Sequence, residues 1–185
     1  DFVLPFQSSG SGRVYLSRKD PEYVAVPRPC RPRKGRRAGE GSAEVLAQLH
    51  KVPGCENLTW NDVQIASTIF AVKPGDGSAR EQAASCQRVL GAGANIVTEY
   101  ATKRYRSNLI NWGMLPLQLV GATPFGLGDY VFIPNVREAL KGDLQDIKAY
   151  VLGDTAKEFS LYMAPLTADE RKILADGCLI NFYKH

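Results

Sequence analysis

The spacing of apolar positions along the chain predicts both strands and helices. Residues 63–72 are rich in β-branched and aromatic side chains, which is typical of a buried strand. Shorter apolar runs predict further strands at residues 94–98, 115–120, 130–134 and 147–152. Residues 42–50 instead carry apolar side chains at helical spacing, so we expect an amphipathic helix there.

Strands and helices alternate in the middle of the chain. The first long strand ends in a glycine-rich turn at residues 73–77, and the pattern predicts a helix from Ser78 to about Leu90. A short strand and a helix at residues 102–112 follow, and Gly113 ends that helix. This order is typical of a β-α-β unit with parallel strands.

The end of the chain carries a helix-start signal. Thr167 and Glu170 match the capping box S/T-x-x-E, in which each side chain accepts a hydrogen bond from the other residue's backbone N–H. We expect a helix from there to about Ala175, ended by Gly177.

The domain organisation follows from where the regular elements fall. We expect one domain over residues 1–185, with a loop-rich first part at residues 1–62 and an α/β body at residues 63–185. Residues 13–17 alternate as in a strand, whereas residues 28–37 carry six positive charges around internal prolines and are expected to form a loop.

Composition narrows the class of protein. Of 185 residues, 44% are hydrophobic and 23% are charged, which is typical of a globular chain and excludes a disordered or fibrous one. No apolar run approaches the roughly 20 residues that span a bilayer. A net charge of +4 does not by itself indicate a nucleic-acid partner. The chain begins at Asp1 without a signal pattern, so we expect a fragment, a processed chain or an excised domain.

The cysteines and histidines show no metal-binding pattern. The cysteines form no C-x-x-C pair and have no histidine at zinc spacing. They are Cys30, Cys55, Cys86 and Cys178. We therefore expect isolated reduced thiols in a cytoplasmic protein, with no metal bound by this chain. His50 and His185 lie far apart, and neither is predicted to be catalytic.

The turn before the central helix has the chemistry of an anion site. A strand-to-helix junction points unpaired backbone N–H groups and the positive end of the helix dipole at a ligand. Gly75 and Gly77 allow close approach of the backbone, and Arg80 can grip a carboxylate with parallel hydrogen bonds. An alternative is purely structural: Ser78 and Glu81 also match a capping box, in which the serine only caps the helix.

Residues 75–117 carry five short motifs in a fixed order. They are GDGSAREQAA at 75–84, LG at 90–91, IVT at 96–98, SNL at 107–109 and GMLPL at 113–117. With these motifs the segment resembles the C-terminal swivelling domain of the aconitase family, whose members carry G-E-G-S-S-R-E-H-A-A, a leucine-glycine pair, a short strand, T-N-L and G-L-L-P-L in this order. The resemblance implies an α/β fold, a three-layer swivelling domain with a mixed, largely parallel sheet flanked by helices.

The resemblance also implies a reaction and roles for particular residues. Ser78 corresponds to a serine base that removes a proton from the carbon next to a substrate carboxylate, and Arg80 to an arginine that binds such a carboxylate. The backbone amides around Gly77 and Ala79 would form the anion cradle. We therefore expect the swivel-domain part of an aconitase-like hydro-lyase that reversibly dehydrates a hydroxy-di- or tricarboxylic acid.

A cofactor and partners outside this chain are implied as well. In the family, cysteines of other domains hold an iron-sulfur (4Fe-4S) cluster that acts as a Lewis acid on the departing hydroxyl. No cysteine here matches that pattern. We expect the cluster on other domains of the same protein or on a large subunit, a small carboxylic acid as substrate, no membrane partner, and no activity in the isolated chain.

The sequence departs from the family pattern at several positions. Ala79 replaces a second serine, Gln82 a histidine and Asp76 a glutamate, which puts the choice of substrate in doubt. The family's further substrate-binding arginine, in an R-G-H context, has no counterpart among residues 1–70, although Arg28 or Arg31 are candidates.

Two other functions stay open. One is the small subunit of an isopropylmalate-dehydratase-like enzyme, although the D-T-D-x-I-I-P stretch of such subunits is absent here. The other is a non-catalytic binding module that kept the fold and contacts RNA through the basic loop at residues 28–37 or the basic and aromatic residues 100–106. We expect solvated charges and packed tyrosines at these positions, and so no RNA partner.

Overall fold

The computed structural model describes residues 2–8, 42–59, 62–126 and 128–184. The expected strand at residues 13–17 and basic loop at residues 28–37 lie outside them, as do Cys30 and His185. Among the helices described, none is both long and apolar enough to cross a membrane.

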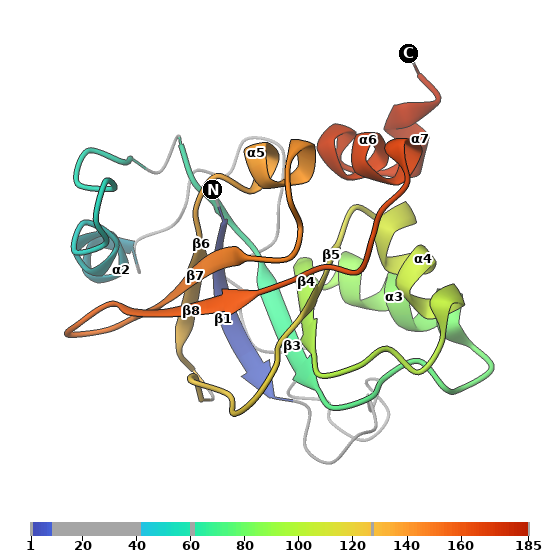
Figure 1. Ribbon diagram of the computed structural model, residues 1–185, viewed down its shortest axis with the longest axis horizontal. Helices are drawn as coiled ribbons and strands as arrows, with labels where there is room; N and C mark the ends of the chain where they lie inside the picture. Colours follow the sequence, from blue (N-terminus) through green and yellow to red (C-terminus); the bar gives the residue numbers. More distant parts are fainter. Residues whose placement is uncertain (1, 9–41, 60–61, 127, 185) are drawn as a thin grey trace.

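The middle of the chain forms a three-stranded parallel sheet with two crossover helices, as the alternation predicted. Thr68 pairs with Ala94, and Ala94 pairs with Leu115. Helices α3 and α4 lie beside these strands on one face (Figure 1). In chain order the elements are β3 (Ser67–Ala71), α3 (Arg80–Val89), β4 (Ala92–Val97), α4 (Lys103–Asn111) and β5 (Leu115–Gln118).

The remaining strands make the sheet a mixed one, with β1 at the boundary between its parallel and antiparallel parts. Strand β1 (Phe2–Ser8) lies in the centre, parallel to β3 on one side and antiparallel to β6 (Tyr130–Ile133) on the other. Strands β7 (Ile147–Leu152) and β8 (Lys157–Leu161) continue the antiparallel part, and the short β2 (Gln64–Ile65) pairs with β1. The eight-stranded sheet has the order β5-β4-β3-β1-β6-β7-β8, with β2 off this path. The α/β class with a mixed sheet is therefore confirmed.

The sheet curls so that its two ends meet. The Gln118 backbone N–H donates to the Tyr162 carbonyl at 2.7 Å, and the Tyr162 N–H donates to the Gln118 carbonyl at 3.0 Å. The inner face encloses one apolar core, which includes Ile96, Leu117 and Val131.

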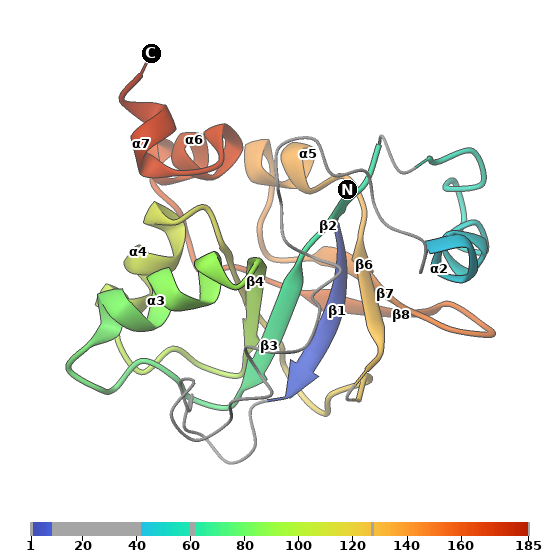
Figure 2. The ribbon, with the colours of Figure 1, turned by 180° about the vertical axis from the view of Figure 1, so that it is seen from behind.

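Helices cover the outer face of the curled sheet. Tyr105, Leu109 and Met114 pack with residues of α3 and β4, while α2 (Ser42–Leu49) packs its Val45 and Leu49 against β6 and β7. Both views place α2 and the α3–α4 pair on opposite sides of the sheet (Figure 1 and Figure 2). Two smaller clusters therefore flank the main core.

Some boundaries differ from those expected. Residues 63–72 form two strands rather than one, because pairing is interrupted at Ala66 between β2 and β3. Strand β8 and helices α5 (Val136–Lys141) and α7 (Leu179–Phe182) were not expected. In the first part of the chain, β1 supplies a central strand of the sheet.

The C-terminal helix is confirmed with its capping box. Helix α6 (Ala168–Asp176) has Thr167 as its N-cap, and the Thr167 side chain accepts from the Glu170 N–H at 3.2 Å. The Glu170 side chain accepts from the Thr167 N–H at 2.9 Å. Gly177 ends the helix with a φ of 90°.

Candidate active site at the start of helix α3

The glycine-rich turn lies at the carboxyl edge of the parallel strands. It follows β3 and leads into α3, and the loop between β4 and α4 lies beside it. The Glu99 backbone N–H donates to the Val72 carbonyl at 2.9 Å, and the Ala101 N–H donates to the Pro74 carbonyl at 3.0 Å. In α/β proteins ligands bind at the carboxyl ends of the parallel strands, so the turn is in the expected place for a site.

Gly75 fixes the turn against α4. Its φ is +95°, and a Cβ added there would lie 2.5 Å from the Tyr105 Cβ, so only glycine fits. The Thr102 hydroxyl donates to the Gly75 carbonyl at 2.9 Å. The same hydroxyl accepts from the Tyr105 N–H at 3.3 Å and thereby caps α4. One side chain thus starts α4 and holds the turn.

Tyr105 forms a polar floor beneath the turn. Its ring is buried, and its hydroxyl accepts from Gln87 Nε2 at 2.9 Å and Asn95 Nδ2 at 3.0 Å. Burial raises the pKa of Tyr105, although these hydrogen bonds oppose the shift. The hydroxyl therefore stays protonated at neutral pH, and the floor is uncharged.

Ser78 does not cap helix α3. The helix begins at Arg80 with Ala79 as its N-cap, and no side chain of the N-cap residue bonds to the first turn. Ser78 is exposed and makes no hydrogen bond to any residue that the structure describes. The capping alternative, and a helix start at Ser78, are therefore wrong.

The turn also offers free backbone donors. Within the described part of the chain, the N–H groups of Gly77, Ser78 and Ala79 have no hydrogen-bond acceptor. Gly77 and Ala79 are exposed like Ser78, at the N-terminus of a 10-residue helix. Unpaired N–H groups and the helix dipole make this end attractive to an anion.

Arg80 lies folded over its own turn. It is half-buried, and its Nη2 donates to the Asp76 carbonyl at 3.5 Å, at the outer limit of a hydrogen bond. Its Nε is buried without a partner among the residues described. A positive charge is therefore held at the turn by a weak contact that a carboxylate ligand can displace.

A hydrogen-bonded cluster of Glu81, Asn108 and Trp112 lies near the turn and was not predicted from the sequence. The Glu81 carboxylate accepts from Trp112 Nε1 at 2.7 Å. With the Asn108 amide assigned the orientation that satisfies both of its neighbours, its NH2 donates to the other oxygen of Glu81 at 3.2 Å and its oxygen accepts from the Glu81 backbone N–H at 3.1 Å. Glu81 and Asn108 stand in the motifs that carry the family resemblance, but their contact arises only when α3 packs on α4.

The surface around the turn is open. Lys73 and Glu99 form an ion pair at 2.9 Å between the neighbouring loops, and both are more than half exposed. Val72 and Val120, which follow β3 and β5, are 66% and 78% exposed. A cavity of about 440 Å³ lies at the opposite edge of the strands, lined in part by Arg88, Leu115 and Val136, and Ser78 does not line it.

The described residues contain no metal centre. No three His, Cys, Asp or Glu side chains in the described ranges gather as a metal would require. Cys55 is buried beside α2, where burial raises the pKa of its thiol, while Cys86 lies on α3 and Cys178 precedes α7. These thiols do not fit an iron-sulfur cluster, whose cysteine ligands must converge.

Among the basic and aromatic residues 100–106, Tyr105 and Arg106 are used for packing, whereas Lys103 and Arg104 are exposed. Tyr105 is buried, and burial also raises the pKa of Tyr100 well above its ordinary value. Arg106 donates to the backbone carbonyls of Ala164 and Pro165 at 3.0 and 2.7 Å. The buried Tyr105 ring is therefore not free to stack on a base, whereas Tyr100 is partly exposed.

His50 has a structural contact as well. Its Nε2 lies 2.8 Å from the Leu58 carbonyl oxygen, which ties the end of α2 to the following loop. This is the arrangement of a satisfied histidine rather than of a catalytic one.

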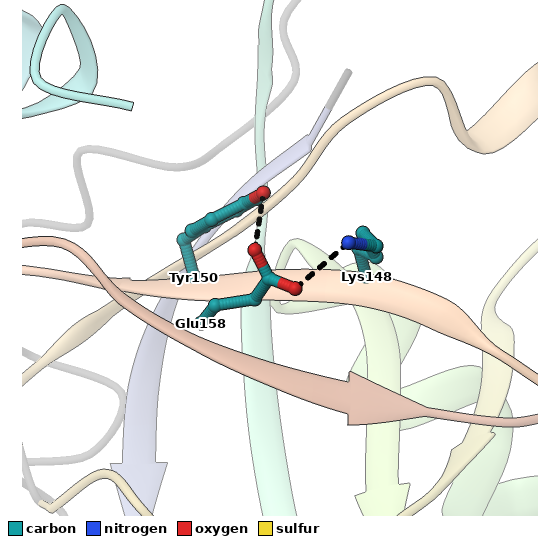
Figure 3. Close-up of polar contacts among 3 residues, drawn as sticks. All are labelled: Lys148, Tyr150 and Glu158. Atoms are coloured by element: carbon teal, nitrogen blue, oxygen red, sulfur yellow. Dashed lines mark hydrogen bonds and ion pairs between the residues drawn. The ribbon is translucent and has the colours of Figure 1, made fainter. Parts of the chain in front are cut away.

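A second polar cluster lies on the β7–β8 hairpin. Glu158 accepts from Lys148 Nζ at 2.9 Å and from the Tyr150 hydroxyl at 3.0 Å (Figure 3). These hydrogen bonds lower the pKa of Glu158, and the same contact raises the pKa of Lys148. The cluster is exposed and joins neighbouring strands, so it supports the hairpin.

Comparison with known proteins relates part of this chain to the aconitase family. Residues 51–121 match the model of the aconitase C-terminal domain family. Aconitate hydratase A of Mycobacterium avium is 34% identical over 116 residues, which is 58% of this chain and 12% of that protein. The crystal structure of 3-isopropylmalate dehydratase from Methanocaldococcus jannaschii matches at 27% identity and a TM-score of 0.43, over 71% of this chain and 68% of that one. The family model and the aconitate hydratase relative therefore confirm the predicted resemblance to the C-terminal domain of the aconitase family.

Proposed function

We propose that this chain is the swivel-domain part of an aconitase-like hydro-lyase. In the proposal, Ser78 is the base, Arg80 binds a substrate carboxylate, and the amides at Gly77 and Ala79 hold the anion. The substrate is a hydroxy-di- or tricarboxylic acid, which the enzyme reversibly dehydrates.

One observation carries this proposal. Ser78 is exposed at a helix N-terminus whose structure does not need its hydroxyl. A serine that capped the helix would have its oxygen engaged with backbone N–H groups. Here the oxygen is available to a ligand.

The surroundings of Ser78 suit a base. A serine hydroxyl is a weak base unless its alkoxide is stabilised, and unpaired amides with a nearby cation supply that stabilisation when water is excluded. Ser78 would accept the proton from the carbon next to a carboxylate. The electron pair of that C–H bond then forms the double bond as hydroxide leaves the neighbouring carbon.

Arg80 is placed to hold the carboxylate next to that carbon. Its guanidinium forms only a 3.5 Å contact with the Asp76 carbonyl, so a bidentate carboxylate offers a stronger partner. A positive charge there also stabilises the second negative charge that develops as the proton leaves.

The remaining half of the site belongs to other domains in this proposal. The chain matches only 12% of the length of the curated aconitate hydratase. The exposed Val72 and Val120 lie at the edge that carries Ser78, as expected of a surface that closes on a partner. That partner is the cluster-bearing part of the same protein or a large subunit, and the iron-sulfur cluster belongs to it.

The test is a serine substitution in the complete, cluster-loaded protein. Ser78→Ala should abolish turnover and leave the affinity for the substrate largely intact. Ser85→Ala is the matched control, because Ser85 lies on the same helix and its hydroxyl donates only to the Gln82 carbonyl at 3.2 Å. Turnover unchanged by Ser78→Ala would remove Ser78 from the mechanism and favour a non-catalytic module.

A further inference from the structure

We propose that Asn108 of α4 and Trp112, which directly follows that helix, are positioning residues for Ser78. They bind Glu81 in the first turn of α3 and so cap that helix from outside, which leaves the Ser78 hydroxyl free. This inference rests on the proposed function, in which Ser78 is the base.

The contact to Glu81 uses both its side chain and its backbone. Trp112 Nε1 donates to one carboxylate oxygen at 2.7 Å. Asn108 donates to the other oxygen at 3.2 Å and accepts from the Glu81 N–H at 3.1 Å. This orientation of the Asn108 amide follows from its hydrogen-bond partners. In the reverse orientation the amide oxygen would face the carboxylate, which is also an acceptor, and the NH2 would face the Glu81 N–H, which is also a donor.

Helix α3 needs such a partner because its own N-cap supplies none. The first N–H groups of any helix lack intrahelical acceptors, and the side chain at the N-cap usually accepts from one of the next residues. Ala79 has no such side chain, and its ψ of 51° departs from the extended backbone of an N-cap serine. Asn108 accepts from the N–H that a local cap would have taken.

The turn that carries Ser78 is thereby held on both sides by α4. Before Ser78, the Thr102 hydroxyl holds the Gly75 carbonyl at 2.9 Å. After Ser78, Asn108 and Trp112 hold Glu81. Ser78 itself contributes nothing to either anchor. The side chains that hold the turn in place are therefore different from Ser78, the proposed base.

The experiment uses the full, cluster-loaded protein with Asn108→Ala. We expect faster hydrogen exchange in the peptide that covers residues 79–84, because the Glu81 N–H loses its acceptor. We also expect kcat to fall about ten- to a hundred-fold while KM stays near the wild-type value, since a misplaced base affects the chemical step. Asn111→Ala is the matched control on the same helix, because Asn111 makes no side-chain hydrogen bond within the described residues.

Trp112→Phe is the second variant and keeps the test decisive if Asn108→Ala does not fold. It removes one donor to Glu81 and keeps an aromatic ring, so we expect changes of the same kind but smaller. Exchange and kcat equal to those of Asn111→Ala in the folded variants would overturn the inference. So would faster exchange with unchanged kcat, or a rise in KM alone.

The two proposals fail in distinguishable ways. If Ser78→Ala keeps wild-type turnover, the proposed function fails, whatever Asn108→Ala does. If Ser78→Ala is inactive and the Asn108 and Trp112 variants behave like Asn111→Ala, only the positioning role fails.

Discussion

The Ser78 side chain plays no part in starting the helix that follows it. The N-cap is Ala79, and the first turn finds its acceptor on Asn108 of another helix. The exposed hydroxyl should thus contribute little to the free energy of unfolding. A stability measurement can therefore separate a functional serine from a capping one.

Ser78→Ala should change the free energy of unfolding by no more than about 0.5 kcal/mol, as for an ordinary surface substitution. Thr167→Ala is the comparison, because Thr167 is a hydrogen-bonded N-cap whose removal should cost about 1 kcal/mol. Urea unfolding of both variants measures the difference. A cost for Ser78→Ala as large as that for Thr167→Ala would mean that Ser78 caps α3 after all.

The glycines of the turn should differ sharply from each other. Gly75→Ala places a methyl group 2.5 Å from the Tyr105 Cβ at a φ of +95°, so it should cost more than about 2 kcal/mol. A Cβ on Gly77 meets no atom within 4 Å, and Gly77→Ala should be close to neutral. Thermal unfolding of both variants checks this, and equal stabilities would contradict the packing described for the turn.

Among the helices and strands, α4 makes the contacts that hold the glycine-rich turn and the start of α3. It holds the turn through Thr102 and Glu81 through Asn108, and it places Tyr105 beneath both. The buried Tyr105 hydroxyl accepts from Gln87 on α3 and Asn95 on β4. One side chain thus joins three elements of the β-α-β unit.

Tyr105→Phe should therefore destabilise the protein by about 1–3 kcal/mol, because the amides of Gln87 and Asn95 lose their acceptor in a buried place. Tyr183→Phe is the control, since Tyr183 is 77% exposed and should tolerate the change. Chemical denaturation of both variants gives the comparison. A neutral Tyr105→Phe would show that the network adds no stability.

The β7–β8 hairpin should respond to acid through Glu158. Its folded pKa is lowered by Lys148 and Tyr150, so the stability that it contributes is present above the unfolded value near 4.5 and is lost as pH falls through the folded pKa. Glu158→Gln should flatten the fall in urea midpoint below pH 4.5. The same acid dependence in variant and wild type would contradict a stabilising role for this contact.

The β-α-β unit could be predicted because β4 and β5, which are buried at every position, form short apolar runs in the sequence, and glycine-containing turns separate them from the helices. Strand β8 lacks such a signal, since only Leu161 at its end is buried. The turn was found from its glycines and Arg80, which are local features. The contact of Glu81 with Asn108 and Trp112 joins residues of separate helices, so no local pattern could reveal it.

In the whole molecule, the curled sheet leaves the carboxyl ends of its parallel strands exposed to solvent. Pairing of Gln118 with Tyr162 closes the sheet and leaves the core inside. The carboxyl edge of β3 and β5 remains open and carries Ser78, Val72 and Val120. This exposed edge suits the proposed function, in which the domain closes over a substrate held by its partner.

The role of Ser78 as the base is tested by following the proton that it would remove. In the complete protein, the hydroxy-acid substrate is incubated in D2O, and incorporation of deuterium at the carbon next to the carboxylate is measured by NMR. If Ser78 is the base, Ser78→Ala should lower this exchange at least about a hundred-fold while the substrate still binds. Exchange at the wild-type rate in the Ser78→Ala protein would contradict this role.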